Sequence, residues 1–201
     1  MSELIGLWLP ILVASVAVFF LSGLFWQGPL HHKADINMLP KDKEDKLFAL
    51  FRELGIDPKF YMFPNWESIQ TKDKAEKAKA YEQWLKGPFG TLTIQPGAPS
   101  YAKNLGLTFV SYLAVSVLVA YLSTLALEPG AGFTPVFQFA ATAGVLGYTF
   151  AIWPGSLFFG KPKRLLLLET VDGVLYGLLT GAVFALLWPS VESVAPAIPA
   201  G

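Results

Sequence analysis

One stretch of the chain decides its fold class. Residues 105–127 read LGLTFVSYLAVSVLVAYLSTLAL and contain no charged side chain. A helix needs about 20 mainly apolar residues, each rising about 1.5 Å, to cross the roughly 30 Å hydrocarbon core of a bilayer. Three further segments meet this requirement, at residues 7–26, 134–153 and 165–188. We therefore expect an all-α integral membrane protein with four transmembrane helices.

The composition supports a lipid environment and excludes several kinds of chemistry. Of the 201 residues, 53% are hydrophobic and only 15% are charged, whereas an ordinary soluble domain has about 25% charged residues. The chain has no cysteine, which excludes disulfides, thiolate catalysis and cysteine-bound metals. Its net charge is zero, so no basic field favours nucleic acid. Phosphate loops, nucleophile elbows and His-Glu-x-x-His motifs are absent from the sequence. We expect a protein that is not an enzyme and has no cofactor.

The basic residues predict how the bundle is oriented. All 15 Lys and Arg residues lie between residues 27 and 103 or in the short turn at 161–164. Because basic loops stay in the cytoplasm, we expect a multi-pass protein of the cytoplasmic (inner) membrane with both termini outside. Glu3 and the lack of nearby Lys or Arg favour a retained anchor over a signal peptide for the first span. The predicted parts are a first span (1–26), a cytoplasmic insertion (27–103), a three-span bundle (104–189) and a Pro/Ala-rich outer tail (190–201).

The insertion is long enough to form a small cap. Hydrophobic periodicity predicts amphipathic helices at residues 41–54 and 73–86, and residues 91–94 allow at most one short strand. The aromatic run FYMFPNW, at residues 60–66, joins the two helices. Two helices bury too little surface for an independent domain, so we expect the insertion to lie on the membrane surface, over the bundle or against another protein. The expected contact residues are Tyr61, Phe63 and Trp66.

The three-span region resembles a known family. FFGKP at residues 158–162 precedes the fourth span, which closes with GAVFALLW at 181–188. The first span contains PILVA at 10–14 and GLFW at 23–26. These patterns are similar to those of a family of small, uncharacterised four-span bacterial membrane proteins, catalogued as a domain of unknown function. The resemblance implies a four-span topology and no established activity, substrate or cofactor. The long insertion departs from the short first loop of that family.

Two acidic residues lie within the fourth span. Glu169 and Asp172 are three residues apart and share one helix face, which Tyr176 continues. An unpaired carboxylate inside the membrane costs roughly 2.5–3.5 kcal/mol, so Asp172 needs a partner, water or a proton. One interpretation is an ion or proton site formed by Glu169, Asp172 and Tyr176. The other is structural, with Glu169 near basic residues at the headgroups and Asp172 bonded to a Tyr or Ser of another span.

Small residues in the third and fourth spans predict close helix packing. Gly173, Gly177 and Gly181 recur every four residues, which lets another helix backbone approach. We expect these glycines to pack against Gly144 and Gly147 of the third span. The alternative is that they pack against a helix of another subunit.

The only histidines follow the first span. His31 and His32, with Asp35 nearby, are weak candidates for a metal site. Adjacent histidines point in different directions, so a metal would need further ligands, and we expect none to be bound.

These features favour a non-enzymatic accessory or scaffold subunit of a larger membrane complex. Its expected partners are other membrane protein subunits and the lipid bilayer, with no nucleic acid. The alternative is a small transporter, or a protein that conducts protons or cations, centred on the acidic residues of the fourth span.

Overall fold

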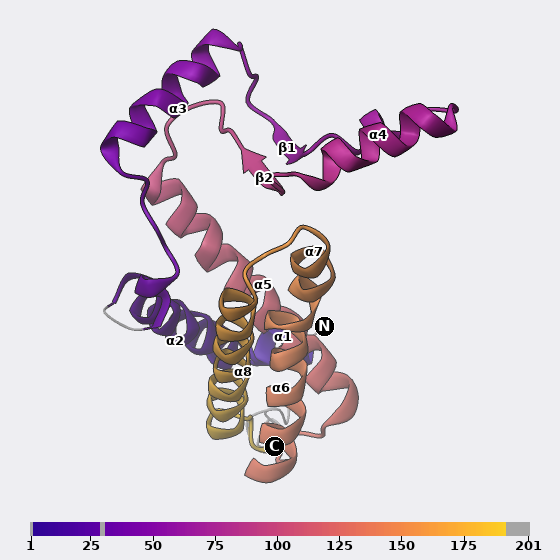
Figure 1. Ribbon diagram of the computed structural model, residues 1–201. Helices are drawn as coiled ribbons and strands as arrows, with labels where there is room; N and C mark the ends of the chain where they lie inside the picture. The colour runs from indigo at the N-terminus through magenta and orange to yellow at the C-terminus, as the bar shows by residue number, and fades with distance from the viewer. Residues whose placement is uncertain (1, 29–30, 192–201) are drawn as a thin grey trace, which may run out of the picture. The chain divides into compact units, whose positions relative to one another are not determined.

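The computed structural model describes residues 2–28 and 31–191 and is about 71% helical (Figure 1). The chain divides into two compact units. The first, which we call the span unit, comprises residues 1–36, 100–154 and 162–201, and the second, the insertion unit, comprises residues 37–99 and 155–161. Each unit is described separately.

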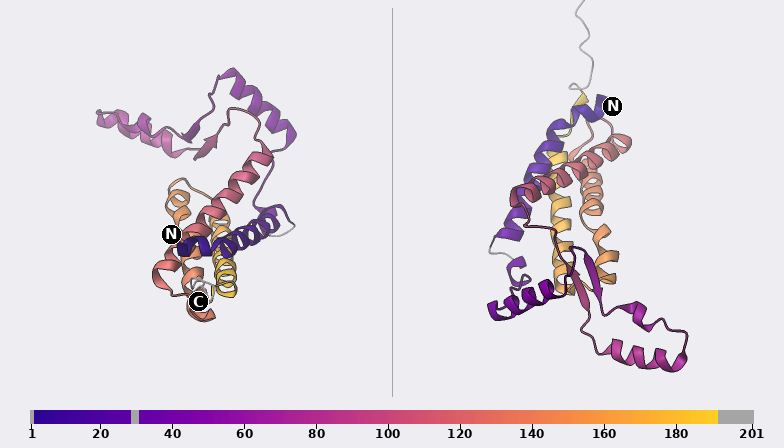
Figure 2. Two further views of the ribbon diagram at one scale, coloured as in Figure 1. Left: turned by 180° about the vertical axis from the view of Figure 1, so that it is seen from behind. Right: turned by 90° about the horizontal axis from the view of Figure 1, so that it is seen from above.

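The span unit contains the predicted apolar helices. Four helices are long and apolar enough to cross a membrane, which suggests a multi-pass membrane protein. A short helix, α1 (Ser2–Gly6), precedes the first span. Three spans are the helices α2 (Trp8–Gln27), α5 (Tyr101–Ala126) and α8 (Lys163–Leu186), and the other, Phe133–Phe158, begins with α6 (Phe133–Tyr148). In the bundle, α2 packs against α5 and α8, and α5 packs against α6 (Figure 2).

The third span is not one continuous α-helix. Its first part, α6, ends at Tyr148, and a 3₁₀ turn, η3 (Phe150–Ile152), leads into α7 (Trp153–Phe158). Pro154 has no backbone N–H to donate, so it is tolerated in the first turn of a helix but not in an interior. The α-helix is interrupted before this proline and restarts at Trp153, which places Pro154 in the first turn of α7; the apolar pattern alone did not predict this interruption.

Helices α6 and α8 lie side by side (Figure 1), and glycines allow their backbones to approach closely. A Cβ atom added at Gly144 would lie 3.0 Å from the Cα of Gly177, and one added at Gly181 would lie 2.5 Å from the Cβ of Ala141. Gly147 faces a different helix, because a Cβ there would lie 2.9 Å from the Cγ1 of Val115 on α5. Gly177 and Gly181 of α8 thus lie against α6 of the same chain, whereas Gly147 of α6 leaves room for α5 to approach.

The exterior of the span unit is apolar, as a lipid-facing surface requires. Leu125 and Leu186 are 68% and 73% exposed, whereas Val18 and Phe184 are fully buried. Large exposed apolar side chains on most sides of a bundle are costly in water but not in hydrocarbon.

The insertion unit contains two short strands, one close to residues 91–94, where the sequence allowed a strand, and one that was not predicted. Strand β1 (Phe60–Phe63) pairs with β2 (Gly90–Thr93) in an antiparallel ladder, with Phe60 opposite Thr93 and Phe63 opposite Gly90. Aromatic and β-branched residues favour extended backbone, which explains why the aromatic run forms a strand. The remaining elements are α3 (Lys41–Glu53), η2 (Trp66–Ile69) and α4 (Lys74–Leu85).

The helices of the insertion unit begin and end close to where the sequence predicts. Asp73 caps α4, with its Oδ1 accepting hydrogen bonds from the backbone of Ala75 at 2.8 Å and Glu76 at 2.9 Å. Gly55 follows α3 with φ +59°, a conformation that favours glycine. Neither α3 nor α4 has a buried residue.

Residues 31–36 and 100–103, at the two ends of the predicted insertion, lie within the span unit. Of the predicted tail, residues 192–201 lie outside the described residues.

Candidate functional site: a buried histidine–aspartate pair beside a pocket

The span unit buries a hydrogen bond between two ionisable side chains. His32 lies in η1 (His31–Ala34), a 3₁₀ turn that follows α2, and Asp172 lies in α8. The Nε2 atom of His32 is 2.7 Å from the Oδ2 atom of Asp172, and the two side chains are 0% and 3% exposed. This partner differs from the Tyr or Ser that the structural interpretation of the sequence assigned to Asp172. The imidazole satisfies the buried carboxylate because it can donate a charge-assisted hydrogen bond.

A second carboxylate lies on the other side of the imidazole. The Oδ2 atom of Asp35 is 3.7 Å from the Nδ1 atom of His32, within ion-pair range but beyond a hydrogen bond. The other oxygen of Asp35 accepts a hydrogen bond from the guanidinium of Arg164. These four groups, which we call the buried polar set, are neutral in sum when His32 holds a second proton. They carry one net negative charge when it does not.

An indole covers one face of His32. The ring of Trp26, near the end of α2, is stacked on the imidazole with centroids 3.9 Å apart and an interplanar angle of 11°. Aromatic faces attract cations, so this contact is compatible with a protonated as well as a neutral ring. Trp26 thereby keeps solvent and lipid from the His32–Asp172 hydrogen bond.

A cluster of tyrosines continues from Asp172 into the bundle. Tyr176 is one helical turn from Asp172 on α8, and its ring centroid lies 5.9 Å from those of both Tyr112 and Tyr148. The hydroxyls of Tyr148 and Tyr176 are buried and have no hydrogen-bond partner among the described residues. The same holds for the side-chain hydroxyls of Ser116, Ser123, Thr149 and Thr180. Such atoms are normally satisfied by buried water, so the cluster marks a polar seam inside an apolar bundle.

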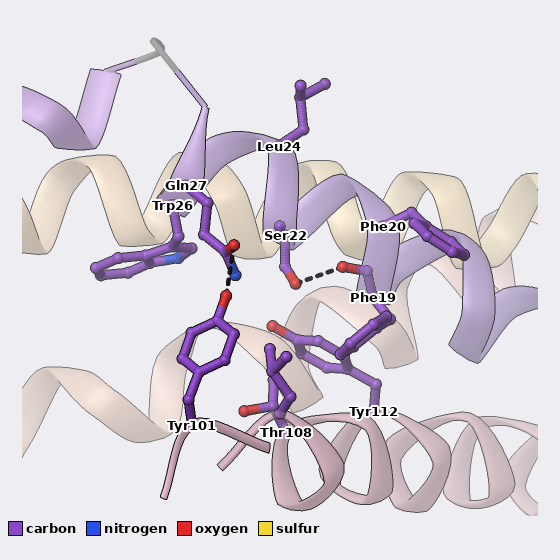
Figure 3. A pocket seen from close by; sticks show the side chains of 11 residues that line it. Phe19, Phe20, Ser22, Leu24, Trp26, Gln27, Tyr101, Thr108 and Tyr112 are labelled. Carbon is purple, nitrogen blue, oxygen red and sulfur yellow. Dashed lines mark hydrogen bonds between the residues drawn. The ribbon is translucent and has the colours of Figure 1, made fainter. Parts of the chain in front are cut away.

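A pocket of about 710 Å³ opens between α2 and α5 (Figure 3). At one end of the pocket, the hydroxyl of Tyr101 donates a hydrogen bond to Oε1 of Gln27 at 2.6 Å. Deeper in, the hydroxyl of Ser22 donates to the carbonyl of Phe19 at 2.8 Å, above the ring of Tyr112 (Figure 3). The pocket and the buried polar set share a wall. Trp26 lines the pocket and stacks on His32, and Tyr112 lines it and contacts Tyr176.

The three residues of the predicted acidic site lie in different surroundings. Asp172 and Tyr176 are buried beside His32 and the tyrosine cluster, whereas Glu169, one turn earlier on α8, is only half-buried. Asp172 is therefore the residue that the bundle encloses. Its histidine partner was not predicted, although two signals pointed to it: a buried carboxylate requires a partner, and the chain has only two histidines.

The weak metal candidates are only partly brought together. His32 and Asp35 are neighbours, but the imidazole of His32 already bridges toward two carboxylates through its two nitrogens. The side chain of His31 lies outside the described part of the structure. Within the described residues, no three His, Cys, Asp or Glu side chains are arranged to hold a metal ion.

The predicted docking residues lie in the insertion unit, around a second hollow. An aromatic groove of about 760 Å³ includes Phe63 and Trp66, which are 40% and 54% exposed. Trp84 also lines the groove and donates its indole N–H to the carbonyl of Pro64 at 3.3 Å. Tyr61 does not line the groove, and its hydroxyl donates to the carbonyl of Asp57 at 3.0 Å. Two of the three predicted residues thus share one surface.

Comparisons of the chain with family models, curated proteins and solved structures find no match. The chemistry of the buried polar set is therefore the basis for a functional proposal.

Proposed function

We propose that this protein is a small multi-pass membrane protein that conducts protons, or couples a proton to transport, through His32 and Asp172. The observation that carries the proposal is the 2.7 Å hydrogen bond between these fully enclosed side chains. Ionisable groups inside a membrane bundle are costly and typically mark ion or proton pathways. Histidine exchanges protons near neutral pH, which suits it to pass a proton to or from Asp172. The proposed role is not enzymatic.

The surroundings of the pair supply a candidate route for the proton. On one side, Arg164 is about half exposed and contacts Asp35, which faces the second nitrogen of His32. On the other side, buried hydroxyls follow Asp172 along α8, at Tyr176 and then at Thr180. Thr180 is eight residues beyond Asp172, or about 12 Å along the helix axis. Hydroxyls bridged by water could relay a proton across this distance.

Proton flux into liposomes tests the proposal directly. Purified protein, reconstituted with a pH-sensitive dye inside the vesicles, should dissipate an imposed pH gradient. Asp172→Asn and His32→Gln each keep side-chain hydrogen bonding but remove the proton exchange, so each should reduce the flux at least tenfold. Glu169→Gln, three residues away on the same helix, is the matched control and should retain it. Wild-type flux in Asp172→Asn, or no flux in the wild type, would refute the proposal.

A second candidate function rests on the insertion unit. The exposed aromatic groove supports the role of an accessory subunit that docks to another membrane protein, because Trp and Phe anchor interfaces when they fill pockets. We expect a Phe63→Ala/Trp66→Ala double variant to insert into the membrane normally but to lose its co-purifying partner. Tyr61→Ala, which changes a residue outside the groove, is the control and should keep the partner. Equal retention by both variants would eliminate the groove as the docking surface.

A further inference from the structure

We infer that the pocket between α2 and α5 binds a single-chain amphiphile whose head group is uncharged and forms hydrogen bonds. This inference is independent of proton movement, because it rests on the position, lining and volume of the pocket. A monoacylglycerol is the simplest lipid of this class.

The position of the pocket matches that of a lipid with its head at the membrane surface. One end of the pocket lies at Gln27, the last residue of α2, and at Tyr101, the first residue of α5. It extends inward to Phe19 and Tyr112 (Figure 3). Tyr112 is seven residues beyond Leu105, where the predicted span begins, a rise of about 10 Å, which is about a third of a 30 Å hydrocarbon core. An occupant would therefore place its head between the helix ends and its chain alongside the spans.

The lining favours a head group without charge. None of the described residues that line the pocket is Asp, Glu, Lys, Arg or His. A phosphate or carboxylate would lose water there without gaining a countercharge, which is costly. The imidazole of His32 lies on the indole of Trp26 and is not itself part of the lining.

The polar lining residues offer both donors and acceptors. Tyr101 donates its hydrogen to Oε1 of Gln27, which leaves the amide N–H₂ of Gln27 as a donor. Ser22 and Thr108 donate their hydrogens to carbonyls of their own helices, at 2.8 and 2.9 Å, and keep lone pairs as acceptors. A glycerol head, whose hydroxyls donate and accept, complements this set.

The volume is suited to one chain. About 710 Å³ falls within the roughly 300–1,000 Å³ of pockets that hold drug-sized ligands. Phe19, Phe20 and Leu105 supply the apolar walls for an acyl chain.

Two glycines provide a matched pair of variants. A Cβ atom added at Gly23, which lines the pocket, or at Gly106, which does not, would meet no atom within 4 Å. Leucine should therefore be accommodated at either position without a backbone clash. Gly23→Leu fills the pocket, whereas Gly106→Leu adds the same side chain to the exposed face of α5.

The test measures binding of monoolein to the full-length purified protein in detergent by native mass spectrometry, with oleate at pH 8 as the charged analogue. We expect one saturable monoolein per chain in the wild type and in Gly106→Leu, at least tenfold weaker binding in Gly23→Leu, and at least tenfold weaker binding of oleate to the wild type. Thr108→Val keeps the shape of the side chain and should weaken monoolein binding about three- to tenfold. This variant replaces Gly23→Leu in the test if Gly23→Leu does not accumulate. The inference would be overturned if Gly23→Leu bound monoolein with the affinity of the wild type. If Thr108→Val is used in its place, unchanged monoolein affinity in that variant would overturn it. Equal binding of oleate and monoolein would overturn the assignment of an uncharged head.

Discussion

The indole of Trp26 lies flat against the imidazole of His32, with 3.9 Å between the ring centroids. Trp26 also forms part of the wall of the pocket between α2 and α5. One side chain therefore separates the buried polar set from the space in which we place a lipid. A substitution of Trp26 should therefore affect both the buried polar set and the pocket.

Replacing Trp26 tests how far the stack protects His32. Trp26→Ala should lower the free energy of unfolding in detergent by about 1–3 kcal/mol, less than the 3–5 kcal/mol typical of a fully buried Trp, because Trp26 is 40% exposed. Trp26→Phe keeps a flat ring and should cost less. The His32 ring resonances, followed by NMR, should shift more in the Ala variant than in the Phe variant. Equal stability and equal spectra would show that the stack contributes nothing.

The four spans could be predicted because their signal is local. An apolar run of about 20 residues implies a membrane helix regardless of what surrounds it. The partner of Asp172 could not be predicted in this way, because His32 is 140 residues away and lies in a short 3₁₀ turn without periodicity. The sequence around Asp172 showed only that this buried carboxylate needs a partner, and it did not show which residue the partner is.

The insertion was harder to predict for a related reason. The β1–β2 ladder joins residues about 30 positions apart, and each strand has only four residues. Neither strand is long enough to show a reliable alternation of polar and apolar residues. The lipid pocket was not predicted at all, since its shape depends on how α2 and α5 cross rather than on either sequence alone.

A double-mutant cycle measures how strongly His32 and Asp172 interact. Each of Asp172→Asn and His32→Gln should destabilise the protein by about 1–3 kcal/mol, because each leaves a buried polar partner poorly satisfied. The double variant should be more stable than the sum of the two losses implies, with a coupling energy of about 1–3 kcal/mol. Unfolding in detergent monitored by Trp fluorescence provides the four free energies. Strict additivity would mean that the 2.7 Å contact carries no net interaction.

The contact between α6 and α8 gives a third prediction. A methyl group at Gly177 would collide with the backbone of Val145, so Gly177→Ala should cost about 1–3 kcal/mol, as overpacking of a tight interface does. Gly106→Ala, where the added methyl meets open space, should be neutral or slightly stabilising, because Ala is the better helix former. Thermal unfolding in detergent compares the two. If Gly177→Ala were as stable as the wild type, the helices could separate without loss.

The orientation predicted from the basic residues can be tested because the chain has no native cysteine. A single cysteine can be placed at Glu128, in the turn between the second and third spans, or at Ser68, in the insertion; both residues are exposed. With both termini outside, an impermeant maleimide added to intact cells should label Glu128→Cys and not Ser68→Cys. Permeabilised cells are the control, in which both positions should react. The reverse pattern in intact cells would place the insertion outside. The head group of the proposed lipid would then lie in the outer leaflet, because the end of the pocket at Gln27 and Tyr101 lies at the helix ends that adjoin the insertion.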